Sequence, residues 1–239
     1  MARRPNLVIV RAGDASIHER WLTGGPRSFD LMVSYFGDQP GRFSQGVEYY
    51  HAQKGARWPV HHAIFSHHMQ MMGDYAHVAL ICDDVDADAR TWNTMFHYCD
   101  WYGLDLAQPS IVGHVSWDIT RPQPGLLLRY TSFVESMAPF FSRRALARVT
   151  PTFGESVSGW GLSFLWAQRL PWPEYRSAIV DAVSVHHTIP VRQGSLRRTL
   201  DALGVDPERE RNEIMKRHGI QAFEIREHAR LRIWHDAGG

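Results

Sequence analysis

The sequence has little lysine, little cysteine and almost no net charge. Basic and acidic side chains number 26 and 25, and Lys54 and Lys216 are the only lysines. Nucleic-acid-binding proteins carry an excess of positive charge, so this balance argues against a nucleic-acid partner. Among so many arginines, Lys54 in QKGARW marks a position that suits a compact ammonium, although Lys216 shows that lysine also occurs without such a reason. Cys82 and Cys99 are too few for a disulfide framework or a zinc site by themselves, and we expect buried thiols.

The chain also lacks a long apolar run. No run reaches the roughly 18 uncharged residues of a membrane-spanning helix, and the apolar part of MARRPNLVIVRAGD is too short for a signal peptide. We therefore expect a cytoplasmic protein, either free or peripheral to the inner membrane. With 239 residues, of which 44% are hydrophobic, the chain is long enough to bury the core of one α/β domain.

An apolar run that ends in acids is the most informative stretch. In YAHVALICDDVD, residues 75–86, the run stops at Asp83, Asp84 and Asp86. This pattern indicates a buried parallel strand that delivers acids to the carboxyl edge of a sheet, where α/β folds bind ligands. Clustered carboxylates repel one another unless a cation or hydrogen-bond donors neutralise them, which favours a metal and phosphate site. The same acids could instead cap the helix expected over residues 87–101, and the spacing does not choose between the two.

Two earlier strands should reach the same edge. Residues 6–11 predict a strand followed by Ala12, Gly13 and a short helical segment. This order is common in nucleotide-binding domains, although the spaced glycines of a dinucleotide fingerprint are missing. Residues 29–36 predict a second strand, which runs towards Asp38.

Histidines form two groups. The late strand expected within residues 175–190 ends in His186 and His187, and a histidine there could complete a metal shell or only cap a loop. The helix expected over residues 57–72 carries the second group, which is His61, His62, His67 and His68. Metal ligands on one helix face usually lie three or four residues apart. These pairs are adjacent or five to seven apart, so we expect a solvated or interface face rather than a metal site.

Gly159 and Gly161 flank Trp160 near the start of another expected helix. Glycine on both sides lets the backbone pass close to a ligand while the indole supplies an apolar stacking face, as in sugar-binding sites. A core tryptophan beside a tight helix entry would show the same pattern, and both interpretations stay open. Glu135, in FVES, could likewise bind a sugar hydroxyl or support the fold.

Seven segments carry a family resemblance when they are taken in order. They are NLVIVRAGD, SYFGD, ICDDVD, LAQPS, SFVESMAPFFSR, SGWGLSFLW and IVDAVSVHHTIPV, within about residues 5–192. Together they resemble the domain-of-unknown-function 707 family, a glycosyltransferase-like group of bacteria and plants. That family looks like a member of the GT-A class of nucleotide-sugar-dependent glycosyltransferases.

The resemblance implies a single α/β domain with a GT-A-like, Rossmann-type mixed sheet flanked by helices. Residues 1–192 would form this domain, and residues 193–239 a helical extension packed on it. An Asp-x-Asp-type motif would hold a divalent metal, Mn²⁺ or Mg²⁺, against the diphosphate. The residues expected at the nucleotide are Arg11, Ala12, Gly13, Asp38, Lys54 and Asp83. The expected metal ligands are Asp84, Asp86 and His187, with His186 as an alternative to His187, and Glu135, Trp160 and Gly161 are expected at the sugar or acceptor.

The chain departs from the family pattern at two positions. Relatives tend to have a continuous Asp-(Asp/Glu)-Asp at the strand end, whereas Val85 interrupts it here. The metal pair could therefore be the first two or the last two aspartates, and we favour the last two. Relatives also continue the tryptophan motif as Gly-Trp-Gly-Leu-Asp, whereas this chain has Ser163. If that aspartate is the catalytic base of the relatives, this protein needs another carboxylate, with Glu155 the first candidate and Asp181 the second.

These observations favour a metal-dependent glycosyltransferase that moves a sugar from a nucleotide-sugar donor to a glycan or small-molecule acceptor. The metal would neutralise charge on the departing nucleoside diphosphate, and a carboxylate would take the acceptor proton. A metal-dependent phosphoester hydrolase or nucleotidyltransferase could use the same aspartates. A non-catalytic nucleotide- or sugar-binding protein is the third alternative, and Ser163 is its support.

Overall fold

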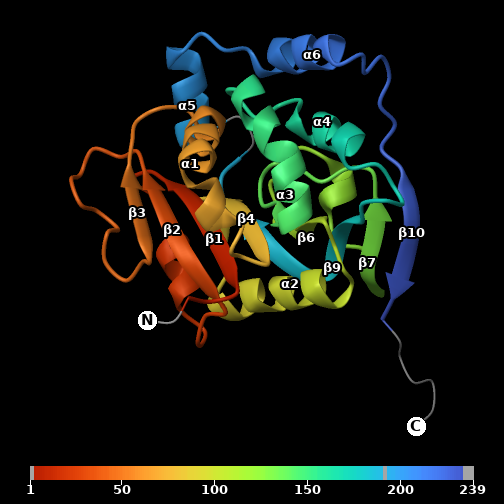
Figure 1. Cartoon of the computed structure of the whole chain (residues 1–239), viewed down its shortest axis with the longest axis horizontal. Coiled ribbons are helices and arrows are strands. Elements are labelled where there is room, and N and C mark those ends of the chain that lie inside the picture. Colours follow the sequence, from red (N-terminus) through yellow and green to blue (C-terminus); the bar gives the residue numbers. More distant parts are fainter. Residues whose placement is uncertain (1–2, 191–192, 234–239) are drawn as a thin grey trace.

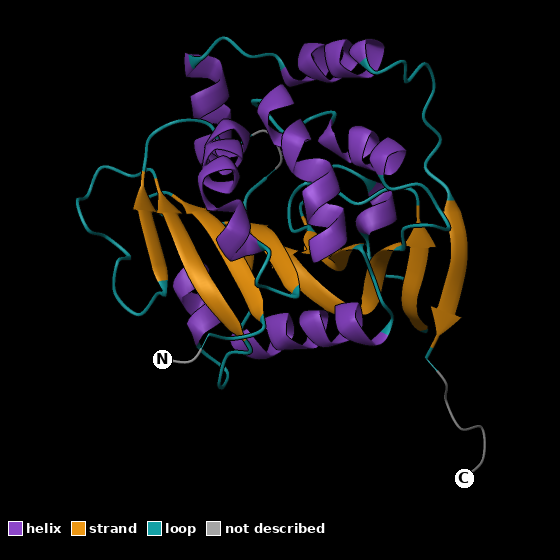
Figure 2. Ribbon diagram, in the orientation of Figure 1, coloured by secondary structure: helices purple, strands orange, loops and turns teal. Residues whose placement is uncertain are grey.

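The structure is a computed structural model that describes residues 3–190 and 193–233. One mixed sheet runs through the molecule, and helices cover both of its faces (Figure 2). The predicted fold, a single α/β domain with a mixed sheet flanked by helices, is confirmed. Within the described ranges, no helix combines the length and the apolar character that crossing a bilayer requires.

The strands follow the order β10-β7-β9-β6-β8-β4-β1-β2-β3 across the sheet, and a short strand, β5, pairs with β9. Their bounds are β1 (Asn6–Ala12), β2 (Phe29–Tyr35), β3 (Tyr49–Ala52), β4 (His77–Cys82), β5 (Val85–Asp86), β6 (Leu106–Gly113), β7 (Leu126–Thr131), β8 (Phe140–Ser142), β9 (Ser177–His187) and β10 (Glu227–Arg232). Strands β1, β2, β3 and β4 are parallel to one another, and β9 is parallel to β6. Parallel strands point their carboxyl ends at one edge, where the side chains that follow them gather.

The helices form a layer on each face of the sheet (Figure 1). Their bounds are α1 (Arg57–Met72), α2 (Ala89–Trp101), α3 (Arg143–Val149), α4 (Leu162–Arg169), α5 (Gly194–Ala202) and α6 (Pro207–Arg217), with 3-10 turns η1 (His18–Leu22), η2 (Asp118–Thr120) and η3 (Thr150–Glu155). Helix α2 packs on one face through Trp92 and Phe96. Helices α1, α3 and α4 pack on the other, with Trp58 and Trp166 in its core. Because both faces are covered, β1 is buried along its whole length, and its residues are apolar except for Asn6 and Arg11.

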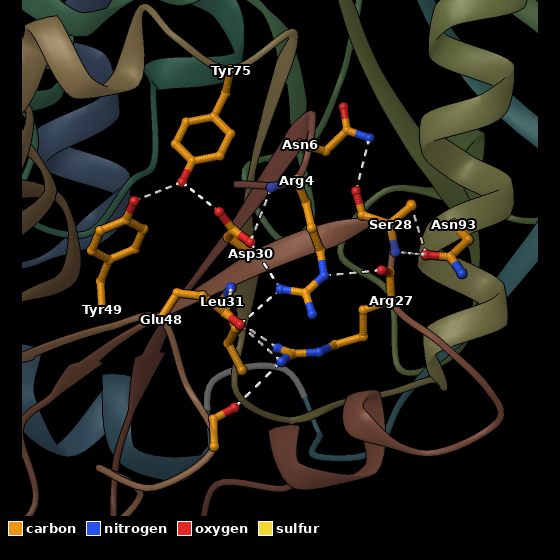
Figure 3. Close-up of polar contacts among 11 residues, drawn as sticks. Arg4, Asn6, Arg27, Ser28, Asp30, Leu31, Glu48, Tyr49, Tyr75 and Asn93 are labelled. Atoms are coloured by element: carbon orange, nitrogen blue, oxygen red, sulfur yellow. Dashed lines mark hydrogen bonds and ion pairs between the residues drawn. The ribbon is translucent and has the colours of Figure 1, made fainter. Parts of the chain in front are cut away.

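Ion pairs and hydrogen bonds tie the amino ends of the first strands together (Figure 3). Asp30 in β2 is buried and accepts hydrogen bonds from Arg4 Nη1 at 2.9 Å and from the Tyr75 hydroxyl at 2.8 Å. Glu48, just before β3, accepts from the same Arg4 atom at 2.8 Å and from the backbone nitrogen of Leu31 at 2.8 Å. This network lies at the edge of the sheet opposite the carboxyl ends of β1 and β2.

The segment after residue 192 contains the two helices expected there, α5 and α6, and a strand, β10, that the sequence pattern did not predict. Asp206 caps α6 by accepting from the backbone nitrogens of Glu208 and Arg209, as expected for the start of that helix. Strand β10 then pairs antiparallel with β7 at the edge of the sheet. Its sequence, EHARLR, is mostly charged and exposed, so it resembles a solvated helix more than a strand. Residues 234–239 of the expected extension lie outside the described residues.

Candidate active site

A cavity of about 170 Å³ lies at the carboxyl edge of the sheet. Its wall includes three acids from two segments of the chain, the adjacent Asp83 and Asp84 and the distant Glu135, together with Trp160 and His187. Residues from the C-terminal segment complete it, namely Gln193, Thr199, Leu200 and Pro207. The cavity therefore occupies the position at which ligands bind in open α/β sheets.

Asp84 and His187 lie next to each other in the wall of this cavity. The two residues of β5 pair antiparallel with His186 and His187 at the end of β9, which places the turn before β5 beside the end of β9. The distance from His187 Nε2 to Asp84 Oδ2 is 3.2 Å, and His187 Nδ1 lies 2.7 Å from the carbonyl oxygen of His114. Burial lowers the pKa of His187, but the Asp84 carboxylate and that carbonyl outweigh the effect, so the pKa is raised.

One carboxylate oxygen of Asp84 takes no part in the contact with His187. Oδ1 is buried and has no hydrogen-bond partner among the described residues. A buried carboxylate oxygen without a partner is costly unless a donor or a cation binds it. Among the described residues, no group of three or more His, Cys, Asp or Glu side chains is placed to hold a metal ion. A divalent cation at Asp84 and His187 would therefore take most of its oxygen ligands from a bound ligand or from water.

Asp86 lies outside the cavity wall. Its carboxylate accepts from Arg20 Nη1 at 2.7 Å, and more than a third of its side chain is exposed. The structure therefore brings Asp84 together with His187 and not with Asp86, the partner that we favoured from the sequence. Helix α2 is capped by Asp88, whose carboxylate accepts from the backbone nitrogen of Thr91 at 2.8 Å. Asp83 and Asp84 are thus not needed as caps.

Asp83 links the ends of β4 and β1. Its Oδ2 accepts from the backbone nitrogen of Gly13 at 2.8 Å. Burial raises the pKa of Asp83 to about 6, against the opposing effect of that hydrogen bond. A side chain at Gly13 would sit 2.8 Å from the ring of Phe36, which lines the cavity. The absence of a side chain at Gly13 therefore leaves space for the Phe36 ring in the cavity wall. Ala12, the preceding residue, is buried in the core.

Two buried arginines lie beneath the acids. Arg11 lines the cavity and donates to the carbonyl oxygens of Gln53 at 2.6 Å and Gly55 at 2.8 Å. Burial lowers its pKa to about 10, so it keeps its charge near neutral pH. Arg57 donates to the carbonyl oxygens of Ser136 at 2.9 Å and Leu80 at 2.8 Å. The positive charges favour the ionised form of the buried acids nearby. Their hydrogen bonds also join the segments that contain Gly55, Leu80 and Ser136.

Arg57 was missed in the sequence analysis. A signal existed, because an arginine in the first turn of a helix is unfavourable for the helix dipole and suggests a specific partner elsewhere. The structure also places His61 in the core below Arg57, where burial keeps its pKa well below the usual range. His61 therefore does not lie on the solvated face expected for it.

Asp38 and Lys54 pair with each other away from the cavity. Lys54 Nζ lies 2.5 Å from Asp38 Oδ1, and both side chains are mostly exposed. They follow the ends of β2 and β3, so they share the carboxyl edge with the acids without lining the cavity wall.

A second, smaller cavity of about 40 Å³ adjoins the first. Glu135 and Trp160 line both cavities, whereas Gly161 and Ser163 line the smaller one only. The backbone of Gly161 has φ of +98°, and a side chain there would meet α6 at 3.1 Å. A glycine is therefore required at the entry to α4.

Glu210 of α6 holds the loop that carries Trp160. Its carboxylate accepts from the backbone nitrogens of Val157 at 2.6 Å and Ser158 at 2.9 Å, and from the hydroxyls of Ser156 and Ser158. This contact was not foreseen, because α6 has the alternating charges of a solvated helix.

The two acids expected as bases lie elsewhere. Both oxygens of Asp181 bind the Arg129 guanidinium at 2.9 Å, and one also accepts from the backbone nitrogen of Gln123. Glu155 lies 2.5 Å from His218 Nε2 and 3.5 Å from Arg217 Nη1. The structure does not bring either acid to the cavity wall.

No model of a known protein family matches the sequence, and a search of curated proteins finds no match. Among solved structures, the chain is similar to S. aureus TarS, at 11% identity and a TM-score of 0.48, over 77% of this chain and 36% of that one. It is also similar to S. aureus TarS 1–349 in complex with UDP-GlcNAc, at 13% identity and a TM-score of 0.58, over 90% of this chain and 66% of that one. The chain thus spans less than two thirds of the length of either structure. At this identity the second likeness shows the fold, which is that of the TarS 1–349 structure.

Proposed function

We propose that this protein is a glycosyltransferase that uses a nucleotide-sugar donor and a divalent cation, Mn²⁺ or Mg²⁺. The observation that carries the proposal is the free Oδ1 of Asp84 beside His187, inside a cavity at the carboxyl edge of the sheet. The likeness in fold to a structure that contains UDP-GlcNAc supports a nucleotide sugar as the ligand.

Asp84 and His187 would hold the cation. When bound, the cation would neutralise the negative charge that builds on the departing diphosphate. Arg11 and Arg57 add fixed positive charge at the floor of the cavity, which favours an anionic ligand. Trp160 presents an indole to the same space, and an aromatic face suits the apolar side of a sugar ring.

A metal-dependent phosphoester hydrolase would use the same pair, so the reaction products decide between the two. A transferase releases the nucleoside diphosphate and joins the sugar to an acceptor. A nucleotide hydrolase or nucleotidyltransferase instead cleaves within the diphosphate and needs no sugar acceptor.

Ligand binding tests the proposal directly. Binding of UDP, of UDP-GlcNAc and of the other nucleoside diphosphates is measured by calorimetry, with Mn²⁺ and with a chelator. We expect one nucleoside diphosphate to bind at least tenfold more tightly with Mn²⁺. Asp84→Asn should abolish this gain, because it removes the charge next to His187.

Asp86→Asn is the matched control, because Asp86 lies two residues away and outside the cavity. It should bind like the wild type. Binding that ignores the chelator, or equal losses in both variants, would contradict the assigned cation site. Failure of every nucleotide to bind would contradict the proposed function.

A further inference from the structure

Glu135 stands where the two cavities meet. The larger cavity contains Asp84 and His187, and the smaller one contains Ser163 and Phe164. Glu135 lines both of them. A donor bound next to Asp84 and a hydroxyl group placed in the smaller cavity, which has room for a group about the size of a water molecule, would therefore both lie near this carboxyl group.

The Glu135 carboxyl group is buried, and one of its two oxygens has no hydrogen-bond partner among the described residues. The residue is 8% exposed, and its backbone nitrogen donates to Gln108 Oε1 at 2.6 Å. The Ser116 side chain lies close enough to the carboxyl group to oppose part of the effect of burial on its pKa. Oε2, however, is buried and has no hydrogen-bond partner among the described residues.

No ion pair of the described part of the chain involves Glu135, in contrast to Asp181 with its arginine. Burial raises the pKa of Glu135 to about 7, which is close to the value that suits proton transfer near neutral pH. A fixed, desolvated carboxyl group with a free oxygen is what a general base requires.

The smaller cavity offers a base at one residue. Of the described residues that line it, Glu135 is the only one with a carboxylate, whereas Ser163 offers a hydroxyl. A serine hydroxyl is far too weak a base to take a proton without further help. Glu135 is therefore the residue of this cavity that is suited to proton transfer.

We propose that Glu135 is the general base of this protein and that the smaller cavity admits the acceptor hydroxyl. The inference rests on the proposed glycosyltransferase function. The acceptor oxygen bonds to the anomeric carbon while its proton passes to the Glu135 carboxylate. The bond from that carbon to the phosphate oxygen breaks, and its electron pair leaves with the nucleoside diphosphate. Attack from the side opposite the leaving group inverts the anomeric centre.

Two substitutions test the assignment. Glu135→Gln keeps the shape and removes the base, and Ser163→Asp restores a carboxylate to the smaller cavity. The assay follows UDP release from UDP-GlcNAc with Mn²⁺, in water alone and with a panel of methyl glycosides as acceptors. We expect Glu135→Gln to lower kcat by a factor of about 100 or more, the usual contribution of a general base. The KM for the donor and the affinity for UDP with Mn²⁺ should stay within threefold.

Recovery of activity by a second substitution is the decisive result of this experiment. In the Glu135→Gln background, Ser163→Asp should recover kcat at least tenfold, which a merely structural role for Glu135 does not predict. Glu155→Gln is the matched control and should leave kcat unchanged, because Glu155 lies off the cavity wall. If Glu135→Gln fails to fold, Glu135→Asp replaces it and should keep part of the activity.

Each contrary result is distinct. Unchanged kcat in Glu135→Gln overturns the base assignment while wild-type turnover still supports the transferase. A raised KM with normal kcat shows that Glu135 only binds a sugar, and weaker UDP binding with Mn²⁺ shows that it serves the cation. Both outcomes overturn the assignment. If the wild type releases no nucleoside diphosphate, either from UDP-GlcNAc or from the sugar derivatives of any other diphosphate that binds, with any acceptor, the proposed function fails, and the inference fails with it.

Discussion

The buried pair of Arg129 and Asp181 allows a quantitative prediction. The two side chains are 1% and 0% exposed, and two hydrogen bonds of 2.9 Å join them. Asp181→Asn keeps the shape but leaves the guanidinium buried without its counter-charge. Removing one partner of a buried pair costs about 3 to 5 kcal/mol, because the other charge stays desolvated. We expect a loss of that size in the free energy of unfolding.

Urea denaturation followed by tryptophan fluorescence measures this loss, with the slope m compared between variants. The double substitution Arg129→Met with Asp181→Leu should recover most of the stability, because an apolar pair of similar volume avoids the desolvation cost. The kcat of the folded fraction should not change in Asp181→Asn. A loss below about 1 kcal/mol in the free energy of unfolding would refute this reasoning. Normal stability combined with lost activity would also refute it and would make Asp181 a candidate catalytic residue again.

Three further predictions concern stability. Glu210→Ala leaves buried amides and hydroxyls without an acceptor and should lower the free energy of unfolding by about 2 to 4 kcal/mol, whereas the exposed Glu213→Ala should change it by less than about 1 kcal/mol, both by urea denaturation. Gly13→Ala pushes on the Phe36 ring and should cost about 1 to 3 kcal/mol by the same assay; an unchanged midpoint would show that the ring moves freely. Burial raises the pKa of Glu135 from 4.5 to about 7, so the folded protein holds this proton where the unfolded chain has lost it. The resulting stabilisation is complete below pH 4.5 and is lost as the pH rises through 7. The free energy of unfolding of Glu135→Gln, measured by thermal melts, should therefore match that of the wild type near pH 4.5 and exceed it at pH 8 by up to about 3 kcal/mol. Equal melting temperatures at both pH values would contradict this.

The strands that build the site could be predicted because their pattern is local. Residues 6–11 and the apolar run before Asp83 are short, apolar and followed by polar residues, which is enough to predict buried parallel strands. Because such strands share a carboxyl edge, the sequence also placed the histidines that end the late strand near the acids, but it left His186 and His187 as alternatives.

The choice between Asp84 and Asp86 could not be predicted in the same way. It depends on the pairing of β5 with the end of β9, about a hundred residues away, and a shift of one residue in such a pairing exchanges the two faces. The pairing of Asp181 with Arg129 spans 52 residues, so nothing near Asp181 in the sequence shows that its carboxylate is already occupied. Glu210 looks like any other acid of a mixed-charge helix until the fold brings it to the serine loop.

The network around Arg4, Asp30 and Glu48 fastens the amino ends of strands whose carboxyl ends carry the cavity. The network therefore fixes the amino ends of these strands, whereas the residues at their carboxyl ends can be substituted without breaking it. A library that randomises residues around the cavity would leave the network intact. Ligand preference at this cavity should for that reason be open to re-engineering with most variants still able to fold.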